Sequence, residues 1–156
     1  MKVLGLDPGT HRVGWGVIEG NALKQNLLAS GCLELPPHTE LGVYLQAIYA
    51  NTKNLLDTYK PDLVAIEKLF FQKNLKTAIS VAQARGVMLL AISELGYSVV
   101  ELSPNTIKSA VTGNGAANKK DVARMVGLLL GSQKERLDDT SDALGAAISA
   151  LVMNKI

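Results

Sequence analysis

Short apolar runs that end in an acidic residue are the most regular feature of the chain. One run from Val3 to Leu6 leads into Asp7 and a Pro-Gly turn, and a second leads from Asp62 to Glu67 with no polar residue between them. Apolar runs of this length, bounded by turn residues, predict buried strands. A strand that is apolar on both faces is typical of the centre of a parallel sheet. We therefore expect two buried strands that each end in a carboxylate.

Three more strands complete the expected sheet. Residues 13–18 and 27–35 follow the first strand after short turns, which predicts an antiparallel meander of three strands. Gly14 and Gly16 inside the second strand fit close packing against a neighbour, or a bulge. Residues 97–102 form the last expected strand.

Helical spacing of apolar residues fills the stretches between and after these strands. The order of elements predicts an α/β fold with a five-stranded mixed sheet, its first three strands antiparallel, flanked by helices on both faces. We expect residues 1–156 to form a single domain, since that length suits one core. The expected helices run from Thr39 as N-cap to near Tyr59, over residues 77–95 up to Gly96, briefly from Ser103 and Pro104, from Asn118 to Leu130, and from about Asp139 to Met153.

The composition fits a globular protein of the reducing cytoplasm. Hydrophobic residues make up 47% of the chain, too many for a disordered protein. Cys32 is the only cysteine, so an internal disulfide is impossible, and we expect it to be a small buried hydrophobe. The amino-terminal residues lack the apolar region of a signal peptide. The longest apolar segment, residues 87–92, is far below the roughly 20 residues that span a bilayer, so we expect no membrane partner.

A third group of acids follows at Asp139 and Asp142. Because they are three residues apart at the start of a predicted helix, their Cβ atoms should lie about 5–6 Å apart on one helix face. Each acid has an ordinary structural alternative. Asp7 can form an Asx turn, Glu67 can end a strand in solvent, and the helix pair can act as caps.

Together, the four carboxylates predict a metal-binding nuclease centre. The ends of neighbouring parallel strands lie side by side, which would bring the two strand acids together, and we suppose that the helix acids share their pocket. Four such groups cannot all ionise in a dry pocket without a cation, because like charges raise each other's pKa. Carboxylate oxygens favour Mg²⁺ or Mn²⁺. Two such ions about 4 Å apart can activate a water molecule and stabilise the leaving oxygen of a phosphodiester.

The charge distribution and the absent motifs narrow the function further. The net charge is +2, but four acids in one pocket would leave ten of the 14 acids against 16 Lys and Arg elsewhere. A basic surface around an acidic pocket suits a polyanionic substrate. Residues 6–10 also resemble the phosphate loop of actin-like ATPases, which need two such domains, whereas this chain has length for one. A Walker A loop is absent, and two histidines give little support to Ser–His–Asp catalysis.

Five motifs resemble those of the RuvC family of Holliday-junction resolvases, within the ribonuclease H-like superfamily. The resemblance covers Leu4 to about Ala150 and implies that four acids are catalytic and bind the metal ions: Asp7, Glu67, Asp139 and Asp142. Some family members have His at the third of these positions. Asp138 is next to Asp139 and makes the assignment of this position ambiguous by one residue, but only Asp139 is three residues from Asp142, as a shared helix face requires. The motifs are Leu6 to Gly9, Gly14 to Ile18, Ile66 to Phe70, Gln83 to Val87, and Asp139 to Leu144.

The same resemblance implies a homodimer that cuts a four-way DNA junction symmetrically in recombination and repair, with a branch-migration motor of the RuvA and RuvB type as partner. A two-fold dimer would place two active sites on opposed strands, and the helix over residues 77–95 is the expected interface. DNA contacts are expected from Lys108 and Lys119, from Lys120 beside a glycine-rich loop, and from Phe70, which would stack on an unpaired base.

Two other functions are compatible with much of the same pattern. A nuclease of this fold that acts on RNA, such as a ribosomal-RNA processing enzyme, would share the strand acids. Phe70 together with the Asp139–Asp142 pair favours the resolvase. A non-catalytic junction-binding module would not need four acids, so the complete set argues against it.

Overall fold

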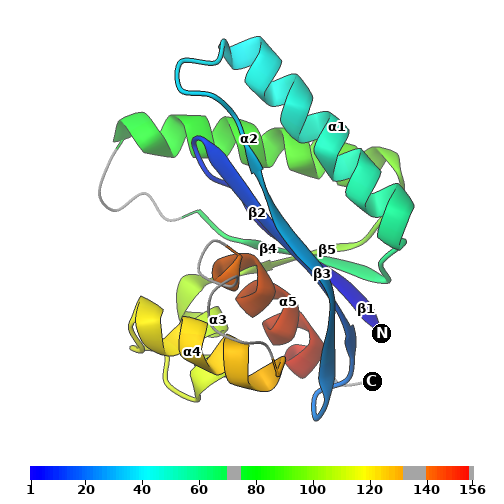
Figure 1. Ribbon diagram of the computed structural model, residues 1–156, viewed down its shortest axis with the longest axis vertical. Helices are drawn as coiled ribbons and strands as arrows, with labels where there is room; N and C mark the ends of the chain where they lie inside the picture. The colour runs from blue at the N-terminus through cyan, green and yellow to red at the C-terminus, as the bar shows by residue number, and fades with distance from the viewer. Residues whose placement is uncertain (70–74, 132–139, 155–156) are drawn as a thin grey trace.

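A five-stranded sheet forms the middle layer of the fold (Figure 1). The computed structural model describes residues 1–69, 75–131 and 140–154. In spatial order the strands are β3 (Gln25–Glu34), β2 (Arg12–Gly20), β1 (Lys2–Asp7), β4 (Leu63–Glu67) and β5 (Val99–Leu102). The first three strands are antiparallel neighbours, whereas β4 runs parallel to β1 and β5 runs parallel to β4. The predicted mixed sheet is therefore confirmed.

Helices cover both faces of the sheet, as predicted (Figure 1). Each face has its own apolar cluster, one formed with the first two helices and the other with the last three. Because side chains alternate along a strand, Leu4 and Leu6 belong to the first cluster, whereas Val3 belongs to the second. The helices are α1 (Leu41–Tyr59) and α2 (Leu75–Glu94) on one face, and α3 (Pro104–Thr112), α4 (Lys119–Leu129) and α5 (Ser141–Met153) on the other.

The last helix, α5, lies directly on the sheet. Its residues from Ala143 to Leu151 are all buried, as expected for a helix enclosed by protein on every side. A Cβ atom at Gly5 of β1 would lie 1.9 Å from the backbone oxygen of Ala143, and one at Gly16 of β2 would lie 2.3 Å from the Leu144 side chain. Gly5 and Gly16 are opposite each other in the sheet. The two glycines therefore form the shallow surface on which the first turn of α5 rests, which confirms close packing at Gly16.

Most predicted helix ends are confirmed by their hydrogen bonds. The Ser103 side chain accepts from the backbone N–H of Thr106, with Pro104 as the first helical residue, and Asn118 caps α4. After α2, Gly96 has a φ of 73° and donates to the Ser93 carbonyl, as in a glycine C-cap.

Several boundaries differ from the prediction, including the start of α2, which lies at residue 75 rather than 77. Glu40, not Thr39, is the N-cap of α1, because the Thr39 hydroxyl donates instead to the Pro36 carbonyl at 2.6 Å. β4 begins after Asp62, whose carboxylate accepts a hydrogen bond from the backbone N–H of Lys2. β5 begins at residue 99 rather than 97, and α5 at residue 141 rather than about 139.

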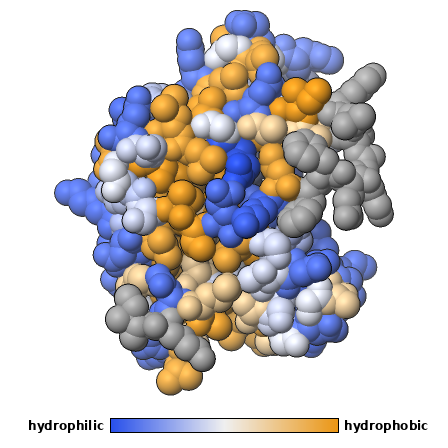
Figure 2. All heavy atoms as spheres, turned by 180° about the vertical axis from the view of Figure 1, so that it is seen from behind, coloured by the Kyte–Doolittle hydropathy of each residue, from blue (hydrophilic) through white to orange (hydrophobic). Residues whose placement is uncertain are grey.

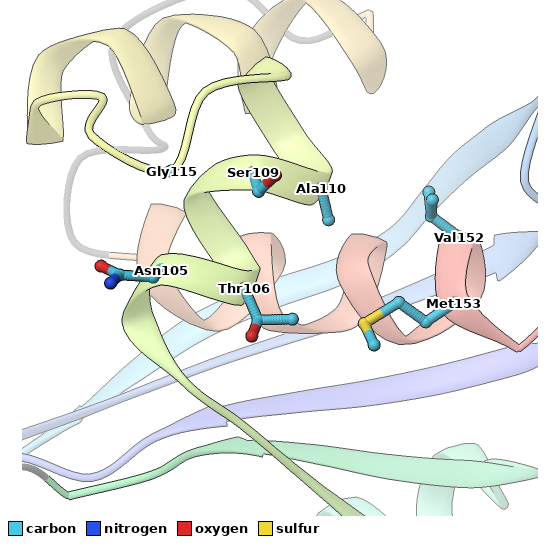
Figure 3. A pocket seen from close by; sticks show the side chains of 7 residues that line it. All are labelled: Asn105, Thr106, Ser109, Ala110, Gly115, Val152 and Met153. Atoms are coloured by element: carbon cyan, nitrogen blue, oxygen red, sulfur yellow. The ribbon is translucent and has the colours of Figure 1, made fainter.

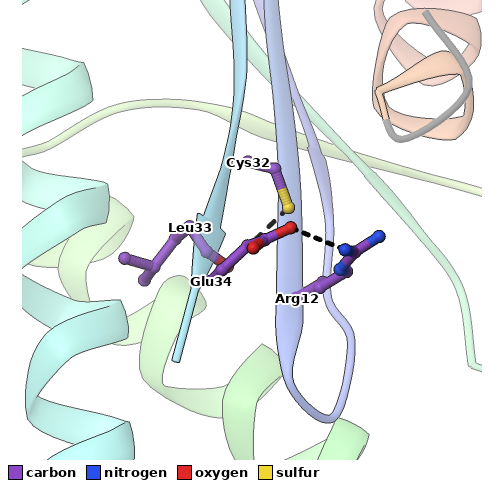
Figure 4. Close-up of polar contacts among 4 residues, drawn as sticks. All are labelled: Arg12, Cys32, Leu33 and Glu34. Atoms are coloured by element: carbon purple, nitrogen blue, oxygen red, sulfur yellow. Dashed lines mark hydrogen bonds and ion pairs between the residues drawn. The ribbon is translucent and has the colours of Figure 1, made fainter. Parts of the chain in front are cut away.

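Cys32 also differs from the prediction. It lies on the edge strand β3 and is only partly buried, with its Sγ 3.8 Å from the Leu33 carbonyl oxygen. Beside it, Arg12 and Glu34 form a cross-strand ion pair at 2.8 Å (Figure 4). Both side chains of that pair are 57% exposed, so it contributes little to stability. In the part of the chain that the structure describes, no helix is long and apolar enough to cross a membrane.

The contact between α5 and β1 generates a stability prediction. We expect Gly5→Ala to lower the free energy of unfolding by about 2–3 kcal/mol or more, because the new methyl group would meet backbone rather than a movable side chain. Gly115→Ala is the matched control, since its Cβ would be 3.5 Å from the nearest atom. Urea unfolding of both variants gives the comparison, and equal midpoints would show that α5 can shift away from the strand at little cost.

Candidate active site

Two of the predicted acids lie at adjacent strand ends. Leu6 of β1 is paired with Ile66 of β4 in a parallel register, so Asp7 and Glu67 follow as the last residues of the two strands. Strand alternation directs both acids to the same face as Ala65, the face covered by α5. The two apolar runs that end in acids are therefore neighbouring strands, and their carboxyl ends lie side by side.

Asp142 joins these two acids from the first turn of α5. It precedes Ala143, whose backbone touches β1 at Gly5, two residues before Asp7. The close glycine contact therefore brings the start of the helix to the end of the strand. The predicted fourth acid, Asp139, lies outside the described residues, and so does Phe70. The role of Asp139 stays a prediction, but the helix-face argument for it does not hold as made, because α5 begins at residue 141 with Thr140 as its N-cap.

The three carboxylates interact electrostatically. Burial, followed by the negative charges of Asp142 and Glu67, raises the pKa of Asp7 from its ordinary value of 3.8 to about 7. Burial and then the charge of Asp142 also raise the pKa of Glu67, while the charges of Lys119 and Lys108 act in the opposite direction. The cluster therefore holds more negative charge than its surroundings can easily stabilise, which favours binding of a cation.

A cavity of about 270 Å³ opens over the cluster. Charged side chains line one part of the cavity and apolar side chains line the rest. The helices α3, α4 and α5 all begin at this cavity, through Pro104, Lys119 and Asp142. Helix N-termini carry partial positive charge and attract anions such as phosphate. The lining residues are Glu67, Pro104, Ile107, Lys108, Lys119, Val122 and Asp142.

Lys119 is the cation bound most closely to the cluster. Its Nζ donates to Oδ2 of Asp142 at 2.7 Å. This hydrogen bond raises the pKa of Lys119, and burial opposes the rise. Lys108 lines the same cavity, whereas Lys120 is exposed and is not among the described lining residues. The structure thus brings two of the three predicted lysines to the acids.

Some residues of the site carried no functional signal in the sequence. Ile107 and Val122 form the apolar wall, but their helical spacing indicates only core packing. Tyr44 is 5% exposed, and its hydroxyl donates to the carbonyl of Gly9 in the turn after Asp7. That turn is tight, because a Cβ at Gly9 would lie 2.1 Å from the backbone oxygen of Arg12. Tyr44 therefore orders the turn behind Asp7.

The chemistry of the donor set fits a hard divalent cation. Asp7, Glu67 and Asp142 supply carboxylate oxygens, the ligands that Mg²⁺ and Mn²⁺ prefer. Among the residues the structure describes, no three His, Cys, Asp or Glu side chains are already arranged to hold a metal ion. In this site the Lys119 ammonium group is bonded to the Asp142 carboxylate.

A second, larger cavity lies on another side of α3 (Figure 3). It measures about 560 Å³. Its described lining carries no acidic or basic side chain, so it offers neither metal ligands nor phosphate contacts. The lining residues are Asn105, Thr106, Ser109, Ala110, Gly115, Val152 and Met153.

Comparisons with known proteins agree with this geometry. The family model described as "Crossover junction endodeoxyribonuclease RuvC" matches residues 3–150. Proteins of that name from Syntrophomonas wolfei and Heliobacterium modesticaldum are 45% and 44% identical to the chain, covering 97% and 95% of it and 88% and 92% of the relatives. The solved structure of T. thermophilus RuvC in complex with a Holliday junction substrate aligns with a TM-score of 0.89 at 34% identity, covering 96% of this chain and 92% of that one. The predicted family resemblance and fold are confirmed.

The raised pKa of Asp7 generates a pH prediction for the metal-free protein. Between about pH 4 and pH 7 the folded state keeps a proton that the unfolded state releases, so stability falls as the pH rises through this window. We expect Asp7→Asn to be more stable than the wild type at pH 8 by about 1–3 kcal/mol, and nearly equal to it at pH 4.

Urea unfolding in EDTA at the two pH values measures this difference. Asp57→Asn, at an exposed position of α1, is the matched control and should show no pH-dependent gain. If the free energies of unfolding of Asp7→Asn and the wild type differed equally at both pH values, the fold would not raise the pKa of Asp7.

Proposed function

Because the chain belongs to the RuvC family of crossover junction endodeoxyribonucleases, we propose that it resolves four-way (Holliday) junctions by paired, symmetric nicks in recombination and DNA repair. The observation that supports this most strongly is the meeting of Asp7, Glu67 and Asp142 beside a cavity that also contains two lysines. Acids for a metal ion and cations for a phosphate stand together there, as hydrolysis of a phosphodiester requires.

In the proposed mechanism the acids hold divalent cations and the lysines hold DNA. Asp7, Glu67 and Asp142, with Asp139, would bind Mg²⁺ or Mn²⁺, two ions per site. When bound, such ions activate a water molecule and stabilise the leaving oxygen. Lys108 and Lys119 would bind the phosphate at the mouth of the cavity, helped by the helix N-termini there. The apolar wall of Ile107 and Val122 would limit the access of bulk water.

Two further DNA contacts are predicted. Lys120, exposed on the first turn of α4, would contact a neighbouring phosphate. Phe70 follows Glu67 by three residues and would stack on a base freed at the crossover, which would offset part of the energy needed to open a base pair. The Phe70 role follows from the sequence resemblance and the Lys120 role from its place beside a glycine-rich loop, and both stay predictions.

Paired nicks require two active sites, and we propose a homodimer formed through α2. Ile79, Gln83, Gly86 and Leu90 are exposed along one stripe of this helix, with Ile79 60% and Leu90 53% exposed. Nothing lies within 4 Å of a Cβ built at Gly86, so a partner helix has room to approach. Figure 2 shows a broad hydrophobic area on the back of the molecule, as an interface would need. Contact with a branch-migration motor, and residence in the cytoplasm, are further parts of the proposal.

The main test separates binding from cleavage on one synthetic junction. We expect Asp7→Asn, Glu67→Gln and Asp142→Asn each to lose cleavage in Mg²⁺ and to keep junction binding, because each removes a metal ligand and a negative charge near phosphate. Gel shifts in Ca²⁺ measure binding, since Ca²⁺ coordinates flexibly and positions water poorly. Asp57→Asn is the control. Cleavage at the wild-type rate by any one variant would remove that residue from the site.

The lysine contacts predict a change in salt dependence. We expect Lys108→Ala and Lys119→Ala each to weaken junction binding across sequences and to reduce the magnitude of the salt slope by about 1 per lost phosphate contact. Lys24→Ala, at the exposed turn between β2 and β3, is the matched control and should leave the slope unchanged. Equal slopes for all three variants would identify Lys108 and Lys119 as solvated surface residues.

The dimer proposal predicts that one charge can separate the subunits. We expect Leu90→Glu to sediment as a monomer, because a buried carboxylate without a partner strongly disfavours an apolar interface. Leu23→Glu, at a position 97% exposed in a turn, should sediment like the wild type. Sedimentation velocity decides between these outcomes, and an unaltered dimer in Leu90→Glu would place the interface elsewhere.

A further inference from the structure

Lys119 is bonded to an acid that the metal ion needs. We propose that Lys119 is the resident counter-cation of the acid cluster, which an incoming divalent ion displaces from Asp142 and so releases to the DNA phosphate. The inference deepens the proposed function and rests on its metal site. It gives Lys119 two successive partners, a carboxylate in the metal-free protein and a phosphate in the loaded complex.

The geometry of the ion pair supports displacement. The Lys119 Nζ is 2.7 Å from Asp142 Oδ2, and the lysine also interacts with the charges of Asp7 and Glu67. The lysine side chain is 73% exposed and the aspartate side chain 32% exposed. Exposed ion pairs of this kind contribute little to stability, so the lysine can leave at small energetic cost.

Simultaneous occupation is unfavourable for two reasons. A metal ion bound to Asp142 would draw on the same carboxylate group, whose Oδ2 now accepts from Lys119. An ammonium group and a divalent ion at one carboxylate would also repel each other at short range. Once released, the Lys119 side chain still borders the cavity, because the residue is the first of α4 and lines the opening. A phosphate entering the cavity is the natural new partner.

Lys108 provides an internal comparison. It lines the same cavity and its charge acts on Glu67, but no hydrogen bond between it and a carboxylate is found among the described residues. Removing Lys108 therefore relieves only the repulsion that any nearby cation exerts on a metal ion. Removing Lys119 relieves that repulsion and also frees the Asp142 oxygen. By linkage, metal and junction should then strengthen each other's binding through Lys119.

The first test measures metal binding by the whole protein without DNA. Mn²⁺ binding is followed by the loss of the free-ion electron paramagnetic resonance signal, for the wild type, Lys119→Gln and Lys108→Gln. We expect Lys119→Gln to bind Mn²⁺ about two- to fivefold more tightly than the wild type, and Lys108→Gln to show a clearly smaller gain. Equal gains in the two variants would mean simple repulsion and would overturn the proposal, as would no gain in Lys119→Gln or no Mn²⁺ binding at all.

The second test follows the ammonium group itself. Reductive methylation labels free lysine amines, and peptide mass spectrometry compares Lys119 with its exposed neighbour Lys120. We expect Mn²⁺ to increase labelling of Lys119 relative to Lys120, and Asp142→Asn to increase it without metal. Labelling of Lys119 that responds to neither change would overturn the displacement. A protein that passes both tests yet cuts no junction would reject the proposed function alone, and a cutting enzyme that fails them would reject only this inference.

Discussion

The first turn of α5 rests directly on Gly5 of β1, and the whole candidate site depends on that contact. A side chain at residue 5 would meet backbone atoms of Ala143, so only glycine allows the helix to approach so closely. The contact places Asp142, one residue earlier, beside Asp7, two residues later in the strand. Parallel pairing of β1 with β4 then adds Glu67. Three segments that are far apart in the sequence thus meet through the backbone contact between β1 and α5 and the parallel pairing of β1 with β4.

The same arrangement is electrostatically unfavourable for the protein alone. Burial and mutual repulsion raise the pKa of Asp7 and of Glu67, so the folded state resists full ionisation of its own acids. Lys119 and the N-termini of three helices offset part of this repulsion. A site of this kind gains stability when a divalent cation binds, and it presents positive charge to phosphate around a negative centre. In the proposed function, this loss of stability is exchanged for affinity, as is common at functional sites.

The local elements of the site could be predicted from the sequence, but most of the tertiary contacts that bring them together could not. Apolar runs ending at Asp7 and Glu67 predicted two strand ends, and alternation along each strand predicts their common face. The meeting of these two acids with Asp142 was supposed for a shared metal centre and supported by the family resemblance, since nothing local in the sequence encodes the approach of α5 to Gly5. Residue preference predicts Thr39 as the cap of α1, yet its hydroxyl bonds to the Pro36 carbonyl and Glu40 caps the helix. The Lys119–Asp142 bond cannot be predicted from the sequence, because a contact across 23 positions leaves no spacing signal.

The most direct measurement compares three substrates under one set of conditions. The protein is incubated in Mg²⁺ with a synthetic four-way DNA junction, a matched linear duplex and an RNA hairpin, and again in excess EDTA. We expect paired, symmetric nicks in the junction alone, and no cleavage of any substrate in EDTA. Cleavage of the RNA hairpin in preference to the junction would contradict the proposed substrate, and undiminished junction cleavage in EDTA would contradict the metal site.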